Sequence, residues 1–267
     1  MDLNLIKIFF NKNILNIILI IILLIIILLC YYNMTNNTSN KIVVFDMDET
    51  LGSFQQFSII VYIFEKIKKN KINQKEFNKL LDIFSNYLRT DIINILNYLK
   101  EKKIKKEVDK IIIFTNNQGP KEWARKIKNY LNYKVNYTLF DKIIGAYKIE
   151  NDTILNERLR TSHEKKYNDL INILNISKNM NICFIDDVYH ENMDNEKIFY
   201  IHVNPYNYEY LVGDIIILLR KNLNYTNKEI IMYSKELRQY KVRKTNNINE
   251  KSNTKEILKL IQQFLKS

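Results

Sequence analysis

The stretch Lys41–Phe54, KIVVFDMDETLGSF, decides the fold of this chain. Its apolar run IVVF is followed at once by the polar run DMDET, which starts at Asp46. A short, β-branched apolar run that is bounded by polar residues predicts a buried β-strand. Ligands of open α/β folds bind outside the carboxyl ends of the strands, so chemistry is expected at the acidic run.

Two carboxylates, Asp46 and Asp48, lie two residues apart directly after this predicted strand. Like charges that lie so close cost free energy unless a cation or a shared proton compensates them. Carboxylate oxygens are also the ligands that Mg²⁺ prefers. The pair therefore predicts either a magnesium site or acid–base chemistry.

The DMDET run after an apolar strand resembles the first motif of the haloacid dehalogenase-like (HAD-like) phosphatases. Three later segments resemble the remaining motifs of that family and occur in its order: IIIFTNNQGP at 111–120, RTSHEKK at 160–166 and ICFIDD at 182–187. Any one of them is a weak signal in a chain rich in acids and lysines. The ordered set is specific, and the resemblance covers roughly residues 41–219.

The resemblance implies a doubly wound, parallel α/β sheet within a phosphatase domain at 41–240, with a small helical insert at about 55–87. The residue pattern independently predicts alternating helices and strands, which is typical of a parallel sheet. Helices are expected at 88–100, 120–131, 164–174 and 208–221, and further strands near 142–146, 181–185 and 198–203.

The resemblance also assigns roles to the polar residues. Asp46 is expected to be the nucleophile that forms an aspartyl-phosphate, since covalent catalysis divides one difficult displacement into two easier steps. Asp48 is expected to protonate the leaving oxygen and then to activate water. The phosphate is expected to bind Thr115, Asn116 and Lys165, with Lys165 preferred to the adjacent Lys166.

A Mg²⁺ cofactor is implied as well. Its expected ligands are Asp46, the main-chain carbonyl of Asp48, Asp186 and Asp187, the last either directly or through water. Mg²⁺ keeps several waters in such sites, so few protein oxygens are needed.

Other polar and aromatic residues near these motifs have simpler interpretations. Thr50 is expected to support the turn after the first strand. His163 and His190 are interpreted as solvated loop histidines. Trp123, one turn into the helix after the second motif, is interpreted as a packing residue.

The composition narrows the class of protein. The chain has 267 residues, a formal net charge of +12 and a pI near 9.4, and it is rich in Ile, Asn, Lys and Tyr. A basic surface favours anionic partners, although AT-rich codon usage also raises the lysine count. The two cysteines imply no disulfide framework.

The N-terminal part carries a second signal. Residues 14–32 run for 19 residues without a charge, which is long enough for a membrane-spanning helix. A cleaved signal peptide is the alternative, but no small-x-small cleavage site follows. We therefore expect a tail at 1–13, a single-pass anchor at 14–32 and a polar linker at 33–40. Lysines before the span favour a cytoplasmic N-terminus by the positive-inside rule, but the sequence does not determine which side of the membrane the catalytic domain faces.

The C-terminal part, 241–267, is expected to be a charged linker followed by an amphipathic helix at 255–266 that docks on the domain.

The predicted function is a Mg²⁺-dependent phosphate monoester hydrolase that acts on phosphoprotein. The run DMDETL resembles the protein-phosphatase branch of the HAD-like family, whereas TNNQ at 115–118 resembles the branch of polynucleotide 3′-phosphatases. The whole set also resembles uncharacterised HAD-like proteins of large DNA viruses. A polynucleotide 3′-phosphatase and an inactive, membrane-tethered binding protein remain the alternatives.

Overall fold

The computed structural model describes residues 20–28, 40–150, 153–154, 157–240 and 250–267. The chain divides into two compact units, Met1–Ser39 and Asn40–Ser267. In the first unit the described residues, 20–28, are helical. None of the helices in the described ranges combines the length and the apolar character that a membrane crossing requires.

The predicted anchor therefore stays a prediction. Residues 14–19 and 29–32 of the expected span lie outside the described residues, and so do the expected tail at 1–13 and the linker at 33–39. In the C-terminal part, residues 241–249 of the expected linker also lie outside them.

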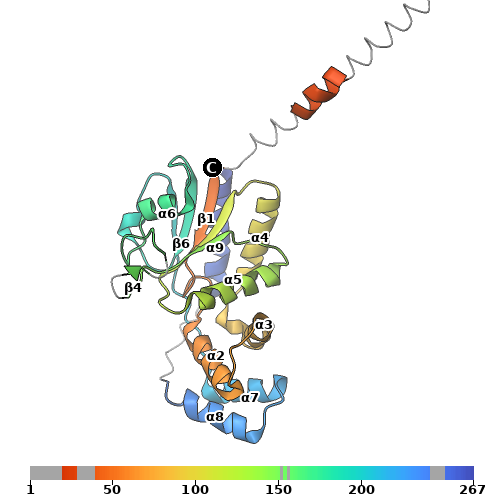
Figure 1. Cartoon of the computed structure of the whole chain (residues 1–267), viewed down its shortest axis with the longest axis vertical. Helices are drawn as coiled ribbons and strands as arrows, with labels where there is room; N and C mark the ends of the chain where they lie inside the picture. Colours follow the sequence, from red (N-terminus) through yellow and green to blue (C-terminus); the bar gives the residue numbers. More distant parts are fainter. Residues whose placement is uncertain (1–19, 29–39, 151–152, 155–156, 241–249) are drawn as a thin grey trace, which may run out of the picture. The chain divides into compact units, whose positions relative to one another are not determined.

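The second unit is built on a parallel sheet of five strands in the order β3-β2-β1-β6-β7 (Figure 1). These strands are β1 (Lys41–Phe45), β2 (Lys110–Phe114), β3 (Lys142–Ile144), β6 (Asn181–Asp186) and β7 (Ile198–His202). Every neighbouring pair in this sheet is parallel. The predicted parallel α/β sheet is confirmed.

The strands are continuously apolar because both faces of the sheet are buried. Alternate residues of β1 enter different cores: Val43 and Phe45 belong to the larger one, and Ile42 and Val44 to the smaller one. All four side chains are fully buried. Successive side chains of a strand point to opposite faces, so one short run anchors two layers.

Helices cover both faces. The larger core contains side chains of α4 (Ile92–Ile104), α5 (Lys121–Val135) and α9 (Glu250–Lys266), and the smaller core those of α6 (Tyr167–Leu174). Figure 1 shows α6 on one side of the sheet and α4 and α9 on the other.

The stretch between β1 and β2 is helical where an insert was expected. It contains α2 (Gln55–Lys68), α3 (Gln74–Ile83) and a 3-10 turn, η1 (Ser85–Tyr87). The helices α7 (Val212–Asn222) and α8 (Asn227–Leu237) lie near them (Figure 1). The sequence did not predict α8, whose start is marked by a capping box between Thr226 and Glu229.

Smaller elements complete the unit. A two-stranded antiparallel ladder joins β4 (Ile149–Glu150) and β5 (Thr153–Ile154), and a 3-10 turn, η2 (Glu191–Met193), follows β6.

Four helix starts differ from the prediction by three residues or more, and one of them is that of α6, which begins at Tyr167 rather than at 164. The helix expected from residue 88 begins at Ile92, because Leu88 and Arg89 bond to the turns before them instead. The helix expected from 208 begins at Val212, because the Tyr210 amide donates to the Gln56 side chain. The C-terminal helix begins at Glu250 rather than at 255.

The early start of α9 has a physical cause in Arg89. The buried guanidinium of Arg89 donates from Nη1 to Glu250 Oε1 at 2.5 Å. It also donates to the carbonyls of Thr50 at 2.6 Å, Glu49 at 2.7 Å and Asn204 at 2.7 Å. One buried cation thus joins the turn after β1, the loop after β7 and the first turn of α9.

Removing the carboxylate of Glu250 should destabilise the fold. The variant Glu250→Ala leaves the buried charge of Arg89 without its counter-ion, and breaking a buried ion pair in this way costs about 3–5 kcal/mol. Urea denaturation of Glu250→Ala should show this loss, whereas Glu256→Ala, an exposed site on the same helix, should unfold like the unchanged protein. Equal midpoints for the two variants would contradict the role assigned to the pair.

Candidate active site

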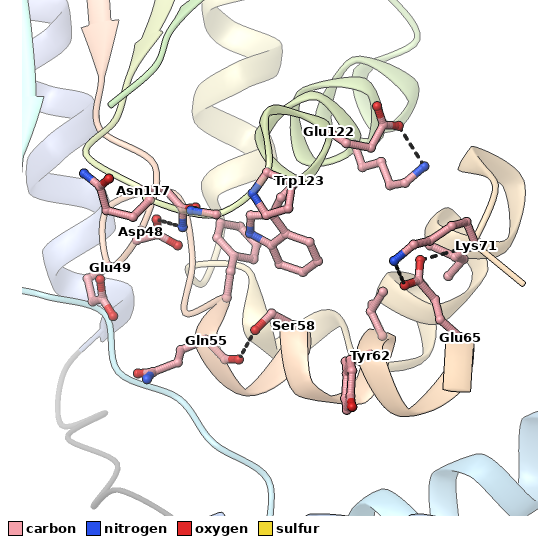
Figure 2. Close-up of a pocket in the computed structure, with 17 residues that line it drawn as sticks. Asp48, Glu49, Gln55, Ser58, Tyr62, Glu65, Lys71, Asn117, Glu122 and Trp123 are labelled. Carbon is pink, nitrogen blue, oxygen red and sulfur yellow. Dashed lines mark hydrogen bonds and ion pairs between the residues drawn. The ribbon is translucent and has the colours of Figure 1, made fainter. Parts of the chain in front are cut away.

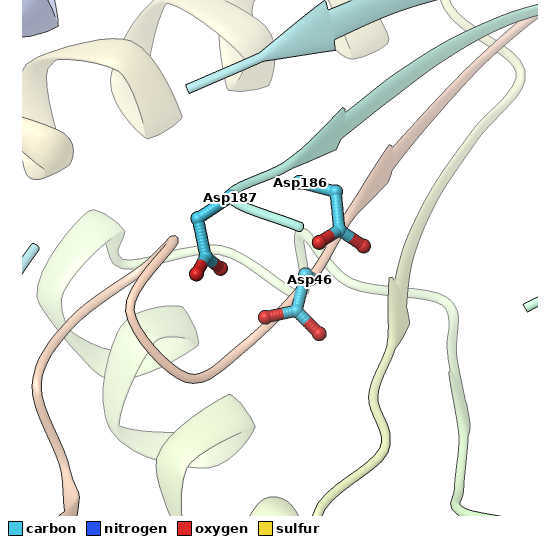
Figure 3. Close-up of side chains that lie close together, drawn as sticks. All are labelled: Asp46, Asp186 and Asp187. Carbon is cyan, nitrogen blue, oxygen red and sulfur yellow. The ribbon is translucent and has the colours of Figure 1, made fainter. Parts of the chain in front are cut away.

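The polar motifs meet where the connections of the sheet change direction. From β1 the chain continues to β2 and β3 on one side, and β6 and β7 lie on the other. Asp46 directly follows β1 and Asp186 ends β6, so both lie at the carboxyl ends of adjacent strands (Figure 3). Such a switch point is where open α/β sheets bind ligands.

Three carboxylates converge there. Asp46, Asp186 and Asp187 each offer an oxygen, and these oxygens lie within 4.8 Å of one another (Figure 3). Oxygens on opposite sides of one cation are separated by about 4–5 Å for Mg²⁺ or Ca²⁺. The donor set is therefore chemically suited to a hard divalent cation, and these are three of the four predicted ligand residues.

Lys165 lies among these acids. Its Nζ donates to Asp46 Oδ1 and, at 2.6 Å, to Asp186 Oδ2, and its side chain is only 1% exposed. Lys166 lies differently, with its Nζ 3.3 Å from Thr161 Oγ1. The structure thus brings Lys165, and not its neighbour, to the acid cluster.

Burial and neighbouring groups shift the pKa values of Asp46 and Asp186 in opposite directions. Burial raises the pKa of Asp46 well above its usual value, and the charge of Lys165 opposes this only in part. Burial also acts on Asp186, but hydrogen bonds from His190 and Lys165 outweigh it and leave the pKa of that carboxyl lowered. One lysine does not compensate the whole cluster, so the remaining charge requires a proton or a further cation.

Asp48 lies beside Asn117. The side-chain amide of Asn117 donates to Asp48 Oδ2 at 2.8 Å (Figure 2). Burial raises the pKa of Asp48, while the donation from Asn117 and the charge of Lys165 lower it. Sequence reasoning missed Asn117. The available signal was its place two residues after Thr115, on the loop that leaves β2.

The other predicted phosphate ligands are engaged by neighbours. Thr115 is buried, and its Oγ1 accepts a hydrogen bond from the main-chain N–H of Asn117 at 3.0 Å. The side-chain oxygen of Asn116 accepts from Arg160 Nη1 at 2.8 Å. Arg160 also donates to the carbonyls of His163 and Glu164 at 2.9 Å each. This buried arginine, which sequence reasoning did not single out, holds the segment that presents Lys165.

The turn after β1 is held to β6 by a side chain. Thr50 Oγ1 donates to Asp187 Oδ1 at 2.9 Å and accepts the amide of Asp187 at 3.1 Å. The preceding residue, Glu49, has φ 58°, in the left-handed region that costs a non-glycine residue free energy. At Gly52 a Cβ would collide with the Tyr87 carbonyl, so the tight turn requires glycine. Thr50 supports the turn, as expected.

His190 is not a solvated loop residue. Its side chain is 12% exposed, and its Nε2 lies 3.5 Å from Asp186 Oδ2. The interpretation from the sequence was wrong because the contact depends on how the loop after β6 folds back.

A cleft of about 1020 Å³ opens beside Asp48; Asp46, Asp186 and Asp187 do not line it. Figure 2 shows it between α2 and the start of α5, with Asp48 and Asn117 at one end and the indole of Trp123 pointing into it. Its lining includes apolar side chains, namely those of Phe54, Val61, Ile72 and Trp123, and four acidic and two basic side chains, namely those of Asp48, Glu49, Glu65, Glu122, Lys71 and Lys126.

No protein-family model, curated protein or solved structure matches this chain. The functional conclusion therefore depends on the residues of the site.

Mg²⁺ should stabilise the folded chain. A ligand present at about 100 times its Kd that binds only the folded state adds about 2.7 kcal/mol to the free energy of unfolding. Thermal unfolding should therefore shift upward with Mg²⁺ relative to EDTA. The shift should be lost in Asp187→Asn and kept in Asp194→Asn, a control at an exposed acid. Identical midpoints with Mg²⁺ and with EDTA for the unchanged protein would contradict a metal site.

Proposed function

We propose that this protein is a HAD-like, Mg²⁺-dependent phosphate monoester hydrolase that acts through an aspartyl-phosphate. The observation that carries the proposal is the contact of one buried lysine, Lys165, with Asp46 and Asp186 at the carboxyl ends of β1 and β6. The order of the four motifs and the parallel sheet support the same function. The carboxylates and the lysine that this chemistry requires lie together at the carboxyl end of the sheet.

In the first step, a carboxylate oxygen of Asp46 attacks phosphorus. The new P–O bond to Asp46 forms while the ester P–O bond breaks, and Asp48 gives its proton to the leaving oxygen. In the second step, Asp48 takes a proton from water, whose oxygen attacks the phosphorus of the aspartyl-phosphate. Phosphate leaves, and the carboxylate of Asp46 and the proton on Asp48 are restored.

The environment of Asp48 suits this double role. A general acid must hold its proton near the working pH, and burial raises the pKa of Asp48 in that direction. The amide of Asn117 stabilises the charged form at 2.8 Å, which helps Asp48 to give the proton away. The two opposing influences leave the group able to act in both directions.

Lys165 supplies positive charge where the transferred phosphoryl group and the nucleophile are both negative. Mg²⁺ bound by Asp46, Asp186 and Asp187 would neutralise further charge on the phosphoryl oxygens. Thr115 lies buried at the end of β2, where its hydroxyl can orient one phosphoryl oxygen. Each of these groups favours the transition state because its position is set by the fold before substrate binds.

The uncharged length of residues 14–32 supports the further proposal that a single-pass membrane anchor tethers the enzyme. Carbonate extraction of membranes tests it, since an anchored chain stays in the pellet and a peripheral one is released.

The variant Asp46→Asn should abolish turnover. It removes the nucleophile, so Mg²⁺-dependent hydrolysis of acetyl phosphate or an aryl phosphate should fall by at least about 10³-fold. Phosphate release with Mg²⁺ and with EDTA measures this, and Asp194→Asn is the control because that acid is exposed and outside the cluster. Undiminished release by folded Asp46→Asn would exclude the proposed nucleophile.

The variant Asn117→Ala should shift the pH dependence. Asn117 stabilises charged Asp48, so removing the amide raises the pKa of Asp48 further. The first step needs Asp48 protonated, so the alkaline limb of the kcat/KM profile should move to higher pH. The exposed neighbour Gln118 offers the control Gln118→Ala. A shift of the limb to lower pH would contradict the assignment of Asp48 as the acid.

A further inference from the structure

We propose that the cleft between α2 and α5 binds the leaving group of a phosphopeptide, and that an aromatic or large apolar side chain next to the phosphorylated residue packs against Trp123. This inference rests on the proposed hydrolase function, whose site it extends. It concerns the substrate class, which the four motifs do not determine.

The position of the acid sets where the leaving group goes. A general acid must lie within hydrogen-bond reach of the oxygen that it protonates. Asp48 and its partner Asn117 both line this cleft, so a leaving group protonated by Asp48 extends into it (Figure 2). At about 1020 Å³, the cleft is at the upper end of the range of small-molecule pockets, about 300–1,000 Å³, so it has room for more than one ring.

The indole of Trp123 gives the cleft a flat apolar wall. Its ring centroid lies 5.6 Å from that of Phe77 and 5.9 Å from that of Phe57, and these contacts hold it from behind. The side chain is half-buried and points into the cleft (Figure 2). Trp123 is therefore more than a packing residue: it packs on one side and is accessible on the other. Flat aromatic or apolar groups pack well against such a ring.

The charges of the cleft disfavour a polyanion. Its two lysines are paired with acids of the same cleft: Lys71 Nζ lies 2.8 Å from Glu65 Oε2, and Lys126 Nζ lies 3.0 Å from Glu122 Oε1. Acidic side chains outnumber these lysines two to one. The net negative charge of the cleft would repel a leaving group that carries further phosphates, but it would not repel an uncharged part of a peptide.

A second cleft, of about 510 Å³, is the rival site for nucleic acid. It is lined by four basic side chains, Lys121, Arg125, Lys128 and Lys142, and also by Thr115 and Asn117 from the segment after β2. Asp48 lines the first cleft and not this one, so a leaving group that Asp48 protonates enters the first cleft, whose charges favour a peptide.

Trp123 is the single tryptophan in the chain, so its fluorescence reports on the cleft without any need for turnover. The test uses the full chain with Asp46→Asn, which prevents hydrolysis, and selective excitation of tryptophan. It is titrated with a phosphoserine peptide that has Phe beside the phosphoserine, with the same peptide carrying Ala there, and with a 3′-phosphorylated oligonucleotide.

The Phe peptide should change the emission saturably and bind about tenfold more tightly than the Ala peptide, a typical effect of one aromatic contact. Adding Ser58→Phe, which fills the cleft from α2, should remove this preference. Ser252→Phe is the matched control, since that serine is exposed on α9. Equal affinities for the two peptides, or no change in emission, would overturn the proposal, and tighter binding of the oligonucleotide would favour nucleic acid instead.

Turnover of acetyl phosphate by the unchanged protein, measured alongside, separates the two proposals. If the protein hydrolyses acetyl phosphate but does not bind the Phe peptide more tightly than the Ala peptide, only the inference about the cleft is contradicted. If the protein binds the peptide but hydrolyses no substrate, the proposed hydrolase function is contradicted and the cleft remains a peptide-binding site.

Discussion

The structure of the site depends on how negatively charged side chains are held together at the carboxyl end of the parallel sheet. Asp46 and Asp186 share the buried ammonium group of Lys165, and a carboxylate oxygen of Asp187 lies within 4.8 Å of oxygens of both acids. Such crowding is tolerated only where a cation or a shared proton compensates it. The parallel sheet brings the acids together because β1 and β6 are neighbours, and the helices on both faces keep water from the strands behind them.

A second cation, Arg89, holds the strained turn that carries Asp48. Glu49 has a left-handed φ, and its carbonyl and that of Thr50 both accept hydrogen bonds from the buried guanidinium. Glu250 neutralises this charge from the start of α9. The last helix of the chain thus contributes to a turn that lies some 200 positions earlier. Strain of this kind persists only where surrounding contacts over-determine it, as they do here.

The charge of the whole chain is a poor guide to its cleft. A net charge of +12 suggests anionic partners, yet acids outnumber lysines in the cleft beside Asp48. The two lysines of this cleft are themselves paired with acids. The side chains that line the cleft are therefore a better guide to the proposed substrate than the net charge of the whole chain.

The sequence by itself determined the parallel α/β fold, because short β-branched runs alternate with amphipathic stretches. It also located Asp46, Asp48, Asp186 and Asp187, since polar residues stand out after apolar strands, and the resemblance of the motifs pointed to Lys165. Arg89, Asn117, Arg160 and the buried contact of His190 were decided only by the tertiary structure. Their partners are distant in sequence or depend on how a loop folds back, and no periodicity records such contacts. The start of α9 and the cleft lined by Trp123 were decided in the same way, because both arise where segments from different parts of the chain pack together.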